Sequence, residues 1–165
     1  LNYDLLVLLS GPEPQRSLLE KKILEQLAAL QIKVAIVRGL PGTAQLPEVP
    51  AHVQVYNHLP ATQLEQLIQE SKLVLCRSGY TTIMDLLKLK KKAVFIPTPG
   101  QTEQEYLAHY LNEQHIFPYN SQETLNVKEV LQTSDNFNYR FPFHNHDFER
   151  YREVVDELIT SIKEH

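Results

Sequence analysis

Residues 72–96 read KLVLCRSGYTTIMDLLKLKKKAVFI, and this stretch decides the fold. It opens with an apolar run at residues 72–76 that is typical of a strand buried on both faces, and it closes with a second one at residues 93–96. Between the two runs, apolar side chains follow the spacing of a helix at Ile83, Leu86 and Leu87. The order strand, helix, strand predicts two parallel strands joined by a crossover helix.

The same alternation continues through the rest of the chain. Further apolar runs predict strands at residues 3–9, 32–38 and 53–56, and a short edge strand at residues 116–117. Helical spacing predicts helices that begin at residue 17, span 62–70 and 103–114, lie near 127–131 and begin again at 147. We therefore expect an α/β domain built on a doubly wound parallel sheet.

Composition bounds the class of protein. The chain has 165 residues, of which 42% are hydrophobic and 22% charged, so it can form one folded domain with a core of its own. Its formal net charge of −4 gives no reason to expect nucleic acid as a partner. The single cysteine, Cys76, excludes an internal disulfide, and no apolar run reaches the roughly 20 residues of a membrane span. His144 and His146 lack partner ligands, so we expect no metal site.

Ligands of doubly wound sheets bind beyond the carboxyl ends of the strands, so the loops after the predicted strands carry the candidate sites. The first loop, residues 10–17, reads SGPEPQRS and opens a helix whose free amides favour an anion. Gly11 allows the backbone to approach a ligand closely, and Arg16 is suited to a bidentate phosphate contact. An ordinary proline-rich turn between strand and helix explains this loop equally well.

The second loop lies within the stretch quoted above. Amide and hydroxyl donors stand where a diphosphate would bind the start of the helix, at Ser78, Gly79, Thr81 and Thr82. Asp85 follows about one turn later, where a carboxylate would accept hydrogen bonds from the two vicinal hydroxyls of a ribose. The alternative is that Ser78 or Thr81 caps the helix and that Asp85 is a solvated acid near its start.

The third loop, residues 98–105, reads TPGQTEQE and follows the apolar run at 93–96. Amide and carboxylate side chains suit sugar hydroxyls, which need paired donors and acceptors, and the candidates are Gln101, Gln104 and Glu105. Thr102 and Glu105 also fit a capping box, in which a hydroxyl and a carboxylate satisfy the first amides of a helix. The two interpretations are compatible.

Three segments of the chain resemble a known family: Cys76-Arg77-Ser78-Gly79 with Asp85, then Phe95-Ile96-Pro97, then Gln104-Glu105. They are similar to the C-terminal, Rossmann-like donor-binding domain of GT-B glycosyltransferases. They are most similar to glycosyltransferase family 28, which includes MurG, the GlcNAc transferase of peptidoglycan synthesis. The resemblance covers about residues 1–115.

The resemblance implies a role for each matching residue. Ser78 and Gly79 would contact the donor diphosphate, Asp85 would hold the ribose, and Gln104 and Glu105 would contact the sugar. The segment His58-Leu59-Pro60 matches the region whose backbone contacts the base, which adds Leu59 to the site. The chain departs from the family at three places, because Asp85 is usually Glu, Glu105 is usually Gln, and the first loop lacks the usual Gly-Gly-Ser pattern.

The resemblance also implies a function. We expect residues 1–165 to form one nucleotide-sugar-binding domain, the C-terminal half of a longer protein whose absent N-terminal domain binds the acceptor and carries the general base. The expected activity is transfer of a hexose or N-acetylhexosamine from a nucleoside diphosphate sugar, with UDP as the nucleotide and without metal or cofactor. This half alone is expected to be inactive. The implied location is the cytoplasm, or the inner face of the membrane if the absent domain makes a peripheral contact there.

Two other functions stay open from the sequence. A nucleotide-sugar hydrolase or epimerase would use the same scaffold and the same donor. A non-catalytic subunit would bind nucleotide or a partner while the chemistry lies on a second chain, an arrangement that the eukaryotic two-subunit GlcNAc transferase illustrates.

Overall fold

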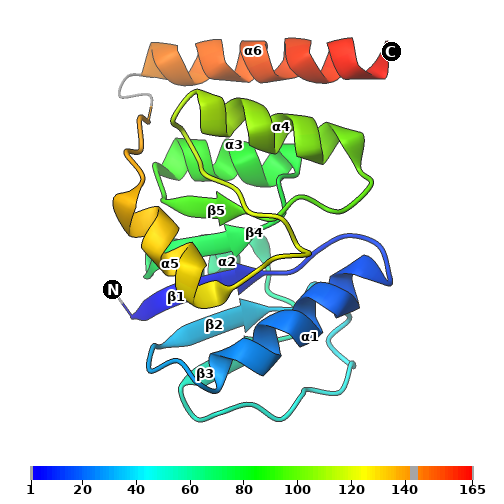
Figure 1. Ribbon diagram of the computed structural model, residues 1–165, viewed down its shortest axis with the longest axis vertical. Coiled ribbons are helices and arrows are strands. Elements are labelled where there is room, and N and C mark those ends of the chain that lie inside the picture. The colour runs from blue at the N-terminus through cyan, green and yellow to red at the C-terminus, as the bar shows by residue number, and fades with distance from the viewer. Residues whose placement is uncertain (1, 142–144, 165) are drawn as a thin grey trace.

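The computed structural model describes residues 2–141 and 145–164, and its centre is a sheet of five parallel strands (Figure 1). The strands stand in the order β3-β2-β1-β4-β5. Their bounds are β1 Tyr3–Leu8, β2 Val34–Val37, β3 Val53–Tyr56, β4 Ser71–Cys76 and β5 Ala93–Phe95. The predicted α/β class and doubly wound parallel sheet are confirmed.

Helices cover both faces of the sheet. One face carries α1 (Gln15–Leu27) and α5 (Val127–Asn136), which share a core with the apolar side chains of that face. The other face carries α2 (Ala61–Gln69), α3 (Tyr80–Leu89) and α4 (Thr102–Glu113). The last helix, α6 (Asn145–Lys163), packs outside α3 and α4, where Val155 is fully buried. Because the central strands are buried on both sides, their sequences read as continuous apolar runs.

The predicted edge strand at residues 116–117 is wrong. Both residues lie just after the turn that follows α4 and are fully buried, and the Phe117 ring packs against Phe95 at a centroid distance of 4.8 Å. Tyr119 instead forms one isolated parallel bridge with Phe95. Two consecutive apolar residues are buried equally well in a turn or in a strand, so the pattern alone does not distinguish the two.

Several helix ends also differ from the sequence prediction. α1 begins at Gln15 rather than Ser17, α5 extends to Asn136, and α6 begins at Asn145. None of the described helices combines the length and hydropathy that a membrane span requires.

Candidate functional site

The strands β1 and β4 lie side by side at the centre of the sheet, with Leu8 opposite Cys76 near their carboxyl ends. The chain leaves β1 toward α1 on one face and leaves β4 toward α3 on the other face (Figure 1). The two loops therefore diverge at this point, which is where doubly wound sheets bind their ligands. The loop after β5 lies close to the loop after β1, since a Cβ atom built on Gly11 would lie 3.8 Å from Thr98 Oγ1.

The N-terminus of α3 offers free amides at this edge. Gly79 is its N-cap residue, and no side chain among the described residues caps it. The first main-chain hydrogen bond runs from the Ile83 N–H to the Gly79 carbonyl, so the amides of residues 80–82 lack a partner within the helix. The alternative that Ser78 or Thr81 caps this helix is therefore wrong, and the amides are available to an anion.

Gly79 is not required by the fold. Its φ of −76° is accessible to any residue, and a Cβ atom built there would meet no described atom within 4 Å. Glycine at such a position leaves the backbone open to direct approach by a ligand.

Ser78 is fully buried, and its hydroxyl is already used. Its Oγ donates a hydrogen bond of 2.8 Å to the main-chain carbonyl of Gln104, in the first turn of α4. The side chain therefore links two helix starts and does not lie on the open surface. Thr81 is exposed and Thr82 is half-buried in the first turn of α3.

Asp85 lies farther along α3 and faces α2 across a groove of about 200 Å³. The lining is apolar at its base and charged at its rim, and consists of Ala61, Leu64, Glu65, Ile68, Asp85, Lys88 and Leu89. Burial raises the pKa of the Asp85 carboxyl and the negative charge of Glu65 adds to the rise, while Lys88 opposes it. Leu59 lies just before α2, half-buried against the core.

The third loop is held together by its own predicted sugar-binding residues. Gln104 Oε1 accepts a hydrogen bond of 2.9 Å from the Thr98 N–H, and its Nε2 donates to Gln101 Oε1 at 2.8 Å. Glu105 Oε1 accepts from the Gly100 N–H at 2.9 Å, and Gly100 has a φ of +83°. The predicted capping box of Thr102 and Glu105 is wrong. The N-cap residue of α4 is Gln101 rather than Thr102, and the Glu105 carboxylate accepts from the Gly100 N–H instead.

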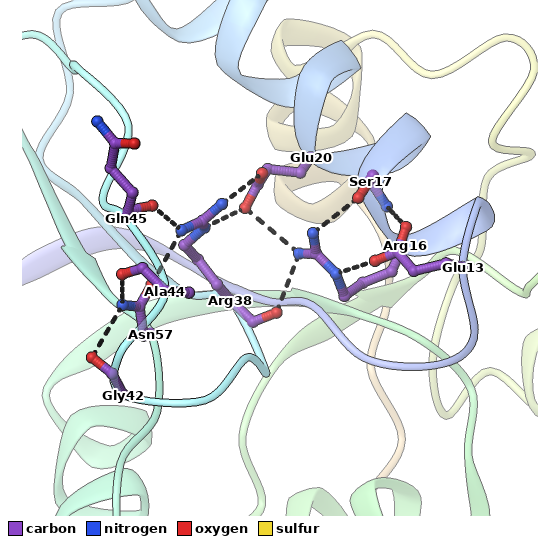
Figure 2. Close-up of polar contacts among 9 residues, drawn as sticks. All are labelled: Glu13, Arg16, Ser17, Glu20, Arg38, Gly42, Ala44, Gln45 and Asn57. Carbon is purple, nitrogen blue, oxygen red and sulfur yellow. Dashed lines mark hydrogen bonds and ion pairs between the residues drawn. The ribbon is translucent and has the colours of Figure 1, made fainter.

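Arg16, in the first turn of α1, is buried in a polar network (Figure 2). Its guanidinium donates to Glu13 at 2.7 Å, to Ser17 Oγ at 2.9 Å, to the Arg38 carbonyl at 3.1 Å and to Glu20 at 3.3 Å. These bonds use four of the five guanidinium hydrogens. In this structure the residue predicted to bind phosphate is therefore engaged within the fold, and its phosphate contact stays a prediction.

Comparison with known proteins identifies the family. The glycosyltransferase family 28 C-terminal domain matches the chain over residues 14–147, which is most of its length. The chain belongs to this family. No curated protein sequence gives a significant match.

Solved structures agree on the fold of this family 28 domain. The glycosyltransferase SnogD of Streptomyces nogalater superposes with a TM-score of 0.64 at 17% identity, over 82% of this chain and 35% of that one. MurG of Acinetobacter baumannii gives a TM-score of 0.58 at 19% identity, over 80% and 40%. The solution structure of ALG13 gives 0.61 at 15% identity, over 91% and 94%. The chain thus spans less than half of the two glycosyltransferases and nearly all of ALG13.

Two buried arginines of the family 28 domain escaped the sequence analysis as functional candidates. Arg38 follows β2 and Arg77 follows β4, and both are buried at the carboxyl edge of the sheet. Arg38 bonds to Glu20, to Asn57 Oδ1 and to the Gln45 carbonyl, while Asn57 bonds to the Ala44 carbonyl (Figure 2). A charged residue directly after a buried apolar run was the available signal for both.

Metal ligands are not brought together in the described part of the chain, where no three His, Cys, Asp or Glu side chains could hold an ion. Of the histidines weighed in the sequence, His144 and the side chain of His146 lie outside the described residues.

Proposed function

We propose that this domain binds the nucleoside diphosphate part of a sugar donor. The diphosphate would lie against the N-terminus of α3, over Gly79, with Gly11 and the first loop facing it. The observation that carries this proposal is the uncapped start of α3 at the switch point of the sheet, where the amides at residues 80–82 have no partner within the helix and a Cβ atom built on Gly79 would meet open space. A helix N-terminus supplies both free N–H donors and partial positive charge to a phosphate.

The nucleoside would extend from α3 toward α2. We propose that Asp85 accepts hydrogen bonds from the ribose hydroxyls and that the backbone around Leu59 contacts the base. Membership of family 28 and the groove beside Asp85 support this direction, and we propose UDP as the nucleotide. The sugar would then reach the first turn of α4, where the side-chain oxygens of Gln101, Gln104 and Glu105 would accept from sugar hydroxyls with the lone pairs that their bonds within the loop leave unused.

The proposed reaction is transfer of a hexose or N-acetylhexosamine to an acceptor. A bond forms between the acceptor and the anomeric carbon while the bond between that carbon and the diphosphate oxygen breaks, and the leaving diphosphate gains negative charge. The α3 amides would stabilise that charge because they are fixed in place before the reaction. A general base would come from an acceptor-binding domain, since we assign none in this chain.

A second arrangement is favoured by one comparison. This chain spans 94% of ALG13, so a domain of this size exists as a chain of its own in another protein. We propose as the alternative that the acceptor-binding domain is a separate polypeptide. The mass of the polypeptide isolated from its natural source, measured under denaturing conditions, separates the two arrangements. A polypeptide about twice the size of this domain favours the first, and one of about the size of this domain favours the second.

Titration calorimetry with UDP, dTDP, ADP and uridine tests the proposal. We expect the nucleoside diphosphates to bind and uridine to bind much more weakly, with UDP the tightest. Failure of every nucleoside diphosphate to bind would overturn the proposed function.

A further inference from the structure

Arg77 lies two residues before Gly79, the N-cap of α3, and the residue is only 2% exposed. One terminal nitrogen of its guanidinium donates to the carbonyls of Ile96 at 3.1 Å and Pro97 at 3.4 Å, at the end of β5. The other donates to the carbonyl of Gln15 at 3.3 Å, at the start of α1. The side chain thus connects the loops that follow β1, β4 and β5.

No carboxylate compensates this charge. Within the described residues, Arg77 has no ion-pair partner, and its Nε has no hydrogen-bond acceptor. Arg16 and Arg38, at the same edge of the sheet, are also buried, but they share the carboxylate of Glu20 (Figure 2). Glu13 and Glu20 thus supply carboxylates to Arg16 and Arg38, while Arg77, just before the N-terminus of α3, has no carboxylate partner among the described residues.

Other buried polar atoms without partners gather at the same edge. Thr98 Oγ1 is one, and it lies beside Gly11. Gln122 Oε1 is another. The side-chain nitrogen of Gln122 donates to Gln15 Oε1, and the main-chain carbonyl of Gln15 accepts from Arg77. Buried polar groups are nearly always satisfied in folded proteins, so three unsatisfied atoms at one edge of the sheet call for an explanation, and a polar ligand bound there would supply one.

Burial without a counter-ion is costly for a cation. Burial alone lowers the pKa of Arg77 to about 10, so the guanidinium stays charged at neutral pH. An anion placed above it gains a long-range attraction that surrounding water screens only weakly.

We propose that Arg77 is a positioning residue for the donor, whose buried, uncompensated charge binds the diphosphate electrostatically while its hydrogen bonds hold the three loops around it. The inference rests on the proposed function and names the group that supplies the positive charge of the site. Arg77 acts through space and through the loops that it holds, because its side chain is too buried to contact a ligand at the surface.

The test measures affinity against ligand charge. Arg77→Gln and Arg77→Lys are titrated with UDP, inorganic pyrophosphate and uridine, beside wild type. We expect Arg77→Gln to weaken UDP and pyrophosphate by about tenfold or more while uridine is unchanged. Arg77→Lys keeps the charge and should restore most of the affinity for the two anions. Arg38→Gln, which removes a compensated arginine, should lower the unfolding temperature but leave the ratio of UDP to uridine affinity unchanged.

The outcomes separate the two proposals. If wild type binds UDP and Arg77→Gln binds it equally well, the role of Arg77 is overturned and the proposed function stands. If wild type binds no nucleoside diphosphate, the proposed function falls and the inference falls with it. If Arg77→Gln does not fold, the Nε–H resonance of Arg77 in wild type decides: we expect UDP to shift it and uridine to leave it in place, and no shift with bound UDP would overturn the proposal.

Discussion

The hydroxyl of Ser78 donates to the main-chain carbonyl of Gln104 at 2.8 Å, and this partly buried bond joins the loop before α3 to the first turn of α4. Both helices begin at the carboxyl edge of the sheet. The bond therefore fixes the proposed diphosphate-binding amides relative to the proposed sugar-binding side chains. The two parts of the donor would be held by one rigid unit.

Replacing Ser78 with alanine should loosen that unit. Ser78→Ala leaves the Gln104 carbonyl without its buried donor, and we expect a loss of about 1 kcal/mol in the free energy of unfolding. We also expect affinity for UDP-GlcNAc to fall by about threefold relative to affinity for UDP, because the sugar contacts depend on the position of α4. Denaturant unfolding and calorimetry measure the two effects.

The control for Ser78→Ala is Thr160→Ala. The Thr160 hydroxyl donates a similar bond of 3.0 Å to the Asp156 carbonyl, but on the exposed surface of α6. Its loss should change stability by less than about 0.5 kcal/mol and leave both ligands unaffected. Equal effects of the two substitutions would contradict a special role for the Ser78 bond.

Gly79→Ala should separate ligand binding from folding. The backbone of Gly79 accepts alanine without strain, but alanine is a poorer N-cap residue than glycine, so the two effects nearly cancel and we expect stability to change by less than about 1 kcal/mol. The added methyl group projects into open space at the start of α3, where we expect it to weaken UDP binding by about tenfold. Gly42→Ala is the matched control, since a Cβ atom there also meets no described atom within 4 Å, and it should leave UDP binding unchanged. Unaltered UDP affinity in Gly79→Ala would exclude a ligand at this position.

The loop after β4 illustrates what the sequence could predict and what it could not. Strands, helices and the gathering of loops at one edge follow from apolar spacing, because burial against a sheet imposes that spacing. The composition of the loop after β4 correctly predicted a helix start there, and its role in binding an anion stays a prediction. It could not predict that the Ser78 hydroxyl points toward α4, since side-chain direction depends on a neighbour 26 residues away.

Charged residues were harder to place from the sequence. Arg16 looked free to bind phosphate, yet Glu13, Glu20 and the Arg38 carbonyl surround it. These partners come from α1, its preceding loop and the end of β2, so only the folded arrangement reveals them. For Arg77 the decisive property is the absence of a carboxylate among the described residues, and no local sequence pattern reports that.

Glu20 should dominate the stability of the network in Figure 2. Glu20→Gln removes the carboxylate shared by two buried arginines, and we expect a loss of about 3 kcal/mol at neutral pH. Glu25→Gln, on the exposed face of the same helix, should change stability by less than about 0.5 kcal/mol. Similar losses in both variants would show that the network contributes little.

The network should also depend on pH. Burial raises the pKa of the Glu20 carboxyl, but Arg38 and Arg16 outweigh burial and hold the pKa below its ordinary value of 4.5. A group with a lowered pKa in the folded state stabilises the fold above its unfolded pKa, and this contribution is lost as the pH falls through the folded value. The stability difference between wild type and Glu20→Gln should therefore be constant above pH about 5.5 and shrink below pH 4.5. Urea unfolding from pH 3 to 7 measures it, and a difference that stays constant to pH 3 would contradict the assigned pKa.

Asp85→Asn should distinguish ribose recognition from a merely solvated acid. If the ionised carboxylate accepts from the 2′-hydroxyl, wild type binds UDP more tightly than 2′-deoxy-UDP, and Asp85→Asn reduces that preference by about tenfold. Because burial and then Glu65 raise the pKa of Asp85 in the folded state, the charged form costs stability at neutral pH, and Asp85→Asn should not destabilise the domain.

The preference of wild type for UDP over 2′-deoxy-UDP should also depend on pH. It should fall as the pH drops through the raised pKa of Asp85, which lies above the ordinary 3.8. Because both ligands carry the same phosphates, titration of the phosphates cancels in this comparison. Glu65→Gln keeps the preference but moves its midpoint to lower pH, since only the neighbouring charge is removed. A wild type that binds both nucleotides equally at neutral pH would leave Asp85 without a role in ribose binding.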